Sequence, residues 1–323
     1  MNAGLFPRPR VSIGMPLYNA ERYLDQAFTS LLAQDYPDFE IVVCDNASTD
    51  RTWEICQRYA AMDPRIRLYR NEVNRGAAYN YNRVVELARG ELFRWAAYDD
   101  WCAPELISQC VAALDAGGPA VVLAYPQTQL IDEHGTVVGR YPDRMHLPHA
   151  RPWRRVAQVA NRFTLCNPVF GVIRTDVLRR TGLIRPWPSS DVTLLVELAA
   201  LGRFHEVPAP LFHRRIHPKS SRQMQGSDRK ALAGVAAWFD PRSRGRVRAP
   251  KLQLTLRTMR ALLARRNGLG PLSRLACALA FAGTFAVRRV RVFAGRVKRR
   301  LRGVPLDTPM WAQPQEGGAG ARR

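Results

Sequence analysis

Apolar residues in the first part of the chain follow two alternating patterns. Short, mostly apolar runs predict β-strands, and they lie at 11–19, 39–48, 66–72, 91–100 and 119–132. The stretches between them repeat apolar residues at three- and four-residue intervals, which predicts amphipathic helices, and they lie at 20–34, 49–62, 77–89 and 105–116. Strands and helices that alternate in this way predict an α/β fold, with a mostly parallel sheet between helices.

The pattern changes beyond this region. Residues 140–165 are basic and are expected to be irregular, whereas 170–184 and 189–207 complete the domain. Residues 218–250 are rich in Ser, Arg and Gly and are expected to form a linker, and 305–323 is expected to be disordered. The chain is therefore divided into an α/β domain over 1–220, a basic linker and amphipathic helical region over 221–304, and a tail over 305–323.

Aspartates stand at the ends of two predicted strands. Asp45 lies near the end of the strand at 39–48, and Asp99 and Asp100 end the strand at 91–100. Ligands of such sheets bind at the carboxyl ends of the strands, so Asp45 and Asp99 are expected to share one cleft. Two adjacent carboxylates repel each other, and solvent, an arginine or a metal ion could face them.

Positive charge is concentrated in the C-terminal part of the chain. The 323 residues carry a formal net charge of +22, and from Asp240 onward 20 Lys and Arg stand against three acidic residues. Such a segment predicts an anionic partner, either a membrane surface or nucleic acid. No recognisable nucleic-acid motif is present and few aromatic residues lie among the arginines, so nucleic acid is not expected as a partner.

Residues 272–302 combine this charge with an apolar stripe on a helical wheel. The stripe consists of Leu275, Leu279, Ala282, Ala286, Val290, Phe293, Val297 and Leu301. The opposite side of the helix consists of Arg288, Arg289, Arg291, Arg296, Lys298, Arg299 and Arg302. A basic amphipathic helix that lacks the ~20 apolar residues of a membrane span is typical of in-plane binding to an anionic membrane. The alternative is a helix that packs on the α/β domain and leaves its arginines in solvent.

The cysteines and the N-terminus bear on localisation. The six cysteines form no CxxC pair and lie mostly in apolar contexts, which predicts buried, reduced thiols. The first ten residues, MNAGLFPRPR, lack the apolar core of a signal peptide. We therefore expect a cytoplasmic protein that is peripheral at the inner face of the cell membrane.

Two common nucleotide-binding motifs are absent from the sequence. No GxGxxG follows the first predicted strand, and no GxxxxGK[ST] occurs anywhere. Three blocks follow a different pattern, and they read VSIGMPLYNAERYLDQAFTSLLAQDYPDFEIVVCDNASTDRT, NEVNRGAAYNYNRVVELARGE and AAYDDWCAPE. In this order and spacing the blocks resemble the family 2 glycosyltransferases of the GT-A fold, over about residues 10–220.

The resemblance implies a nucleotide site. Pro16, Tyr18 and Asp45 would hold the base and ribose of a nucleotide sugar, and Arg75 would approach the base or the phosphates. Asp45 could instead act as a turn or N-cap residue, and Arg75 could be a surface arginine.

The resemblance also implies a divalent cation, Mg²⁺ or Mn²⁺, bound by a DxD-type motif. Here Ala97 stands where the family has its first aspartate, so Asp99 remains as the expected metal ligand. Asp100 is expected to contact the ribose, the metal shell or the next helix. The alternative is that both aspartates cap the helix that begins near Pro104.

The implied general base is Asp191, and Ser190 stands where family members often have a glutamate. An N-cap role for Asp191 also fits. Further along, Arg214 and Arg215 are expected to bind phosphate, and His217 to complete the metal shell. One of the arginines could instead pair with Glu206 or with the aspartates, and His217 could instead make an ordinary polar contact.

The resemblance thus implies a metal-dependent, inverting transferase of the hexosyltransferase type. It would move sugar from a nucleotide sugar, with a UDP-sugar expected, to a glycan or lipid-linked acceptor. The QxxRW signature of processive synthases is absent, which favours the addition of a single sugar. A non-catalytic, membrane-associated relative that only binds the nucleotide sugar remains the alternative, because the motif departs from the family pattern at Ala97 and Ser190.

Overall fold

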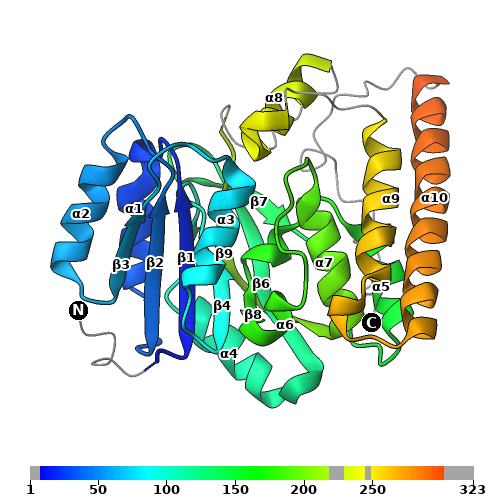
Figure 1. Cartoon of the computed structure of the whole chain (residues 1–323), viewed down its shortest axis with the longest axis horizontal. Helices are drawn as coiled ribbons and strands as arrows, with labels where there is room; N and C mark the ends of the chain where they lie inside the picture. Colours follow the sequence, from blue (N-terminus) through cyan, green and yellow to red (C-terminus); the bar gives the residue numbers. More distant parts are fainter. Residues whose placement is uncertain (1–7, 218–228, 244–248, 302–323) are drawn as a thin grey trace, which may run out of the picture.

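The computed structural model describes residues 8–217, 229–243 and 249–301. Within these residues nine strands form one mixed sheet, in the order β3-β2-β1-β4-β8-β6-β9-β5 with β7 paired to β6 (Figure 1). The strands are β1 (Val11–Leu17), β2 (Phe39–Asp45), β3 (Ile66–Arg70), β4 (Leu92–Trp95), β5 (Trp101–Cys102), β6 (Val121–Ile131), β7 (Val137–Tyr141), β8 (Val172–Arg174) and β9 (Arg203–Arg215). This confirms the expected α/β class.

The parallel arrangement is confined to part of the sheet. β1 pairs in parallel with β2 and β4, β2 with β3, and β6 with β9. β8 runs antiparallel to both of its neighbours, and β5 and β7 are antiparallel additions. Leu17 lies opposite Asp45 in the register of β1 and β2, so these two strands end at the same edge of the sheet.

Helices cover both faces of the sheet. They are α1 (Glu21–Leu32), α2 (Thr52–Met62), α3 (Ala77–Leu87), α4 (Leu106–Ala116), α5 (Pro152–Arg162), α6 (Thr175–Arg179), α7 (Ser190–Leu201), α8 (Arg229–Phe239), α9 (Pro250–Leu263) and α10 (Pro271–Leu301). One hydrophobic cluster contains the inward side chains of α1, α2 and α4, and a second contains those of α3, α5 and α7. The sheet therefore separates two cores.

Two regions expected to lack regular structure contain helices. α5 lies within 140–165, where Val156, Val159 and Ala160 pack into the core. Its Arg155 is also buried and donates hydrogen bonds to the carbonyl oxygens of Ala199 and Ala200, near the end of α7. The expectation of irregular structure was wrong here. Arg155 lies on the buried face of the helix, so that face does not read as apolar in the sequence. The second helix is α8, inside the expected linker at 218–250.

The C-terminal helices share the core of the α/β domain. α10 packs along α5 and α9, and α9 also packs on α7 (Figure 1). Cys277, Phe281 and Phe285 of α10 and Leu262 of α9 are buried in the same cluster as α5 and α7. Helices α9 and α10 thus contribute side chains to one core of the α/β domain.

Two further expectations can be compared with the structure. All six cysteines are free and buried, which confirms the expected state of the thiols. None of the helices in the described ranges combines the length and the apolar character needed to cross a membrane.

Candidate active site

A cavity of about 270 Å³ opens where β1, β2 and β4 end. Six of the residues singled out from the sequence line it: Pro16, Tyr18, Asp99, Asp100, Arg214 and Arg215. The first two lie at the end of β1 and just after it, the aspartates lie between β4 and β5, and the arginines end β9. Pro16 and Tyr18 reach the cavity because β1 ends at the same edge of the sheet as its parallel neighbours. The arginines reach it because β9 pairs with β5 and β6.

Asp99 meets His217 at the edge of this cavity. His217 Nε2 lies 3.0 Å from Asp99 Oδ2, and the imidazole is almost completely buried beside the ring of Tyr23. The two residues expected to bind a metal are therefore neighbours, although they stand far apart in the sequence.

Asp100 is bonded to the protein backbone at the cavity wall. Its Oδ1 accepts the backbone N–H of Arg215 at 2.8 Å. Burial, reinforced by the adjacent charge of Asp99, raises the pKa of Asp100 to about 7. The two aspartates of the motif thus differ in environment, with Asp99 next to an imidazole and Asp100 next to a backbone amide.

The two arginines also differ. The Arg215 guanidinium is buried, lies over the ring of Tyr23, and donates to the carbonyl oxygens of Asp99, Asp132 and Glu133. Arg214 is half-buried and uses Nη1 for the Leu165 carbonyl oxygen, at 2.9 Å, and for the Asn167 side chain. No other donor of Arg214 has a hydrogen-bond partner in the described part of the chain, so Arg214 has more donors left for a ligand.

Asp45 and Arg75 do not line the cavity. Asp45 is fully buried, accepts bonds from the backbone and hydroxyl groups of Ser48, and forms an ion pair with Arg70 at 2.9 Å. Arg75 lies over the ring of Tyr79 and donates to its hydroxyl. In this conformation Asp45 holds the loop after β2, as the turn alternative predicted.

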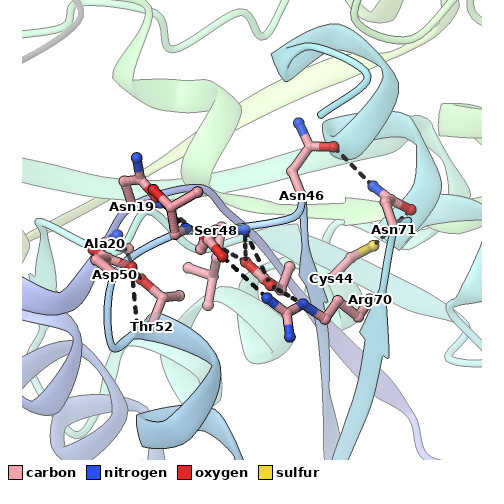
Figure 2. Close-up of polar contacts among 12 residues, drawn as sticks. Asn19, Ala20, Cys44, Asn46, Ser48, Asp50, Thr52, Arg70 and Asn71 are labelled. Carbon is pink, nitrogen blue, oxygen red and sulfur yellow. Dashed lines mark hydrogen bonds and ion pairs between the residues drawn. The ribbon is translucent and has the colours of Figure 1, made fainter. Parts of the chain in front are cut away.

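An amide network that the sequence analysis missed lies beside the cavity. The Asn46 side chain donates to Asn74 and accepts from Asn71, as Figure 2 shows for the second pair. Asn80 donates to the carbonyl oxygens at the ends of β1 and β2. Asn46, Asn74 and Asn80 all line the cavity. In the sequence, Asn46 directly follows β2, and Asn71 and Asn74 follow β3. This recurrence of asparagine after strands could have indicated the network.

A second cavity, of about 90 Å³, adjoins the first. Asp191 lines it, and four residues line both cavities: Tyr81, Phe170, Arg214 and Trp238. Asp191 lies in the first turn of α7, and its Oδ1 accepts the N–H of Val192 at 2.9 Å. Burial raises its pKa despite this bond. The N-cap residue of α7 is Ser189, so the N-cap alternative for Asp191 was wrong, and its role as a base stays a prediction.

Helix α8 closes one side of both cavities through Trp238. It is held close to the start of α3, where Gly76 adopts a positive φ of 86°. A Cβ atom at Gly76 would lie 2.6 Å from the carbonyl oxygen of Phe239, so only glycine allows this approach. No local pattern in the sequence indicated that Trp238 would reach the site.

The residues present suit a divalent cation only in part. No cluster of three or more His, Cys, Asp or Glu side chains that could hold a metal occurs in the described residues. Asp99 and His217 supply one oxygen and one nitrogen atom. Mg²⁺ is usually bound by one or two carboxylates together with substrate phosphates and water, and Asp99 is the one carboxylate of this pair.

Comparison with known proteins points to one enzyme family. The family model of glycosyl transferase family 2 matches residues 12–184. The chain is 37% identical over 116 residues to the putative glycosyltransferase EpsE of Bacillus subtilis, which is 36% of this chain and 40% of EpsE. It is 30% identical over 144 residues to the putative teichuronic acid biosynthesis glycosyltransferase TuaG of the same organism, 44% of this chain and 55% of TuaG. The chain thus spans about half the length of these relatives.

Solved structures show the same fold. The crystal structure of S. aureus TarS in complex with UDP-GlcNAc aligns with a TM-score of 0.54 at 17% identity, over 92% of this chain and 93% of that one. A mannosyltransferase from Pyrobaculum calidifontis, in complex with GDP-Man and Mn²⁺, aligns with a TM-score of 0.52 at 18% identity, over 91% of this chain and 81% of that one. The fold is of the GT-A type, and the family match extends over more than half of the sequence: this chain belongs to glycosyltransferase family 2.

Proposed function

We propose that this protein transfers a single sugar, with inversion, from a UDP-sugar to a glycan or lipid-linked acceptor. The observation that carries the proposal is the pair of adjoining cavities. The larger cavity contains Asp99 and the smaller contains Asp191, and Arg214 stands in the wall that they share. This arrangement suits a donor diphosphate in one cavity and an acceptor hydroxyl in the other, with the sugar between them.

The donor side needs positive charge and hydrogen-bond donors. Arg214 supplies a guanidinium group, which binds phosphate oxygens in a bidentate manner. Pro16 and Tyr18 line the cavity where the base and ribose would lie. Asp99 and His217 would hold Mg²⁺ or Mn²⁺, and such an ion supplies charge neutralisation for the departing diphosphate.

The acceptor side needs a base. As the acceptor oxygen forms its bond to the anomeric carbon, the bond from that carbon to the donor phosphate breaks, and Asp191 takes the acceptor's proton. The raised pKa of Asp191 makes its carboxylate a stronger base than an exposed aspartate. A single displacement of this kind inverts the configuration at the anomeric carbon.

The outer face of the C-terminal helices supports a membrane-bound acceptor. Leu279, Val290 and Phe293 of α10 and Leu252 and Leu256 of α9 are all exposed. In Figure 1 the C-terminal end of α10 lies at the same end of the molecule as α8, which closes the cavities. An anionic membrane bound there would lie near the site. The side chains of Arg296, Lys298 and Arg299, and all of Arg302, lie outside the described residues.

The inner face of the cell membrane is the proposed location. Six buried, free thiols suit a reducing compartment, and a relative is named for teichuronic acid biosynthesis, which supports a role in making a cell-envelope polysaccharide.

The test is a melting-temperature screen of nucleotide sugars with and without Mn²⁺, followed by a turnover assay with the best donor. A donor that binds raises the melting temperature. Stabilisation by a UDP-sugar together with release of UDP supports the proposal. Stabilisation without turnover on any glycan or lipid-linked acceptor would favour the non-catalytic alternative, for which Ala97 in the cavity lining is the structural argument.

A further inference from the structure

An open cavity of about 330 Å³ lies on the surface beside α9, apart from the two cavities of the active site. Arg185, Trp187, Arg257, Arg260 and Arg266 line it. It shares no lining residue with either of the other cavities. Four arginines around one hollow are a feature that sugar transfer at Asp191 does not use.

Two of the four arginines are held in place by one buried carboxylate. Glu197 of α7 is almost completely buried, and its Oε1 lies 3.0 Å from Nη2 of both Arg185 and Arg266. Its Oε2 also accepts the backbone N–H of Gly182 at 3.2 Å. These bonds fix the position of two guanidinium groups and neutralise one of their charges.

The other two arginines lack such a partner. Within the described residues, Arg257 and Arg260 form no ion pair, and the guanidinium of Arg257 lies over the Trp187 ring, 4.5 Å from its centroid. Partial burial, together with the charge of Arg260, lowers the pKa of Arg257. Four guanidinium groups against one carboxylate leave the cavity with a strong excess of positive charge.

Two side chains that line the cavity also contain a buried donor without a hydrogen-bond partner. Arg185 Nε and Trp187 Nε1 are buried and have no acceptor in the described residues. Buried donors without acceptors are uncommon in folded proteins and call for an explanation. A ligand rich in oxygen atoms would supply the negative charge that the four arginines of the cavity lack.

We propose that this cavity binds a phosphate group. Phosphate matches the fork geometry of guanidinium and carries enough charge to engage more than one arginine. The group could belong to a lipid headgroup, because the exposed Leu256 and Leu263 lie on the same helix as Arg257 and Arg260. It could equally belong to a soluble phosphorylated molecule. The proposal stands independently of the glycosyltransferase activity.

The first test is a calorimetric titration of the full-length protein with inorganic phosphate, in the presence of saturating UDP. The double variant Arg257→Ala/Arg260→Ala is expected to bind phosphate at least about tenfold more weakly than the unmodified protein, since charge-assisted hydrogen bonds are lost. The matched control, Arg140→Ala/Arg151→Ala, removes two exposed arginines outside the cavity and should bind as the unmodified protein does. Equal phosphate binding by all three proteins would overturn the proposal.

The second test separates the two sources of phosphate. Sedimentation with phosphatidylglycerol vesicles should fall in the Arg257/Arg260 variant, and not in the control, if a lipid headgroup is the ligand. If phosphate binding falls while sedimentation matches the control, the ligand is soluble. UDP binding, measured on the same samples, reports the state of the active site separately, so a failure there is distinguishable from a failure here.

Discussion

His217 Nε2 lies 3.0 Å from Asp99 Oδ2, although 118 residues separate the two in the chain. The contact joins the segment after β4 to the segment after β9. Both side chains are largely buried, and Asp99 also lines the larger cavity. The oxygen and nitrogen atoms that we propose as cation ligands thus stand together at the edge of the proposed donor site, and their pairing leads to the first prediction.

Asp99→Asn is expected to abolish the part of UDP binding that depends on Mn²⁺, because a neutral amide attracts the cation far less than a carboxylate. Calorimetry of UDP binding with and without Mn²⁺ measures this. Asp100→Asn is the control, since Asp100 is bonded to the amide of Arg215 and should have a smaller effect. Equal and mild losses in both variants would exclude Asp99 as the cation ligand.

Asp191→Asn should reduce turnover by ~10²–10⁴, the usual contribution of a general base, while UDP binding stays near normal. Asp176→Asn is a matched control, because Asp176 occupies the corresponding first-turn position of α6 but is exposed and outside both cavities. A lower melting temperature with unchanged turnover per folded molecule would reduce Asp191 to a helix-terminus residue.

Arg214 and Arg215 should respond differently to the same change. Arg215→Gln is expected to lower the free energy of unfolding by about 3 kcal/mol, because several buried carbonyl groups lose their donor. Arg214→Gln should mainly weaken donor binding and turnover. Urea denaturation and UDP titration of both variants provide the comparison, and a larger loss of stability in the Arg214 variant would contradict it.

Phe293→Asp should weaken sedimentation with anionic vesicles even at low salt, because Phe293 is 70% exposed and the change places a charge in the apolar face. Val138→Asp, which makes a similar change on exposed β7, is the control. Binding of the unmodified protein should decrease as salt rises. Unaltered sedimentation of the Phe293 variant would argue against in-plane insertion of α10.

The buried Asp143 should give the protein a pH-dependent stability. Burial raises its pKa to about 7, although Thr128 and Asn167 donate hydrogen bonds to it. The folded protein therefore keeps a proton that the unfolded chain releases near pH 4. This contribution to stability is complete below about pH 4 and is lost as the pH rises toward 7.

Asp143→Asn removes the titrating carboxyl group. The amide that replaces it can still accept the hydrogen bonds of Thr128 and Asn167 and can donate hydrogen bonds of its own. The melting temperature of the variant, relative to the unmodified protein, should therefore increase from pH 5 to pH 8. The exposed Asp176→Asn variant should show no such trend. A constant difference between the Asp143 variant and the unmodified protein across this range would contradict the raised pKa.

Local patterns in the sequence were sufficient for the first half of the fold. The apolar runs predicted β1, β2 and β3 to within three residues, because parallel strands buried on both faces read as continuous apolar stretches. The strand expected at 91–100 was too long, since β4 ends at Trp95. Of the two aspartates expected to share one cleft, Asp99 lines the cavity, whereas Asp45 is fully buried and does not line it. The three motif blocks determined the family.

Tertiary structure alone decided the rest. Whether Arg155 lies on the surface or caps α7, and whether Arg215 faces a phosphate or the backbone, depends on partners more than 40 residues away in the chain. The sequence predicted the apolar stripe of α10, but only packing showed that Phe281 and Phe285, outside that stripe, attach the helix to α5 while Phe293 faces outward. Periodicity identifies the faces of a helix, and the surrounding elements determine which of them is covered.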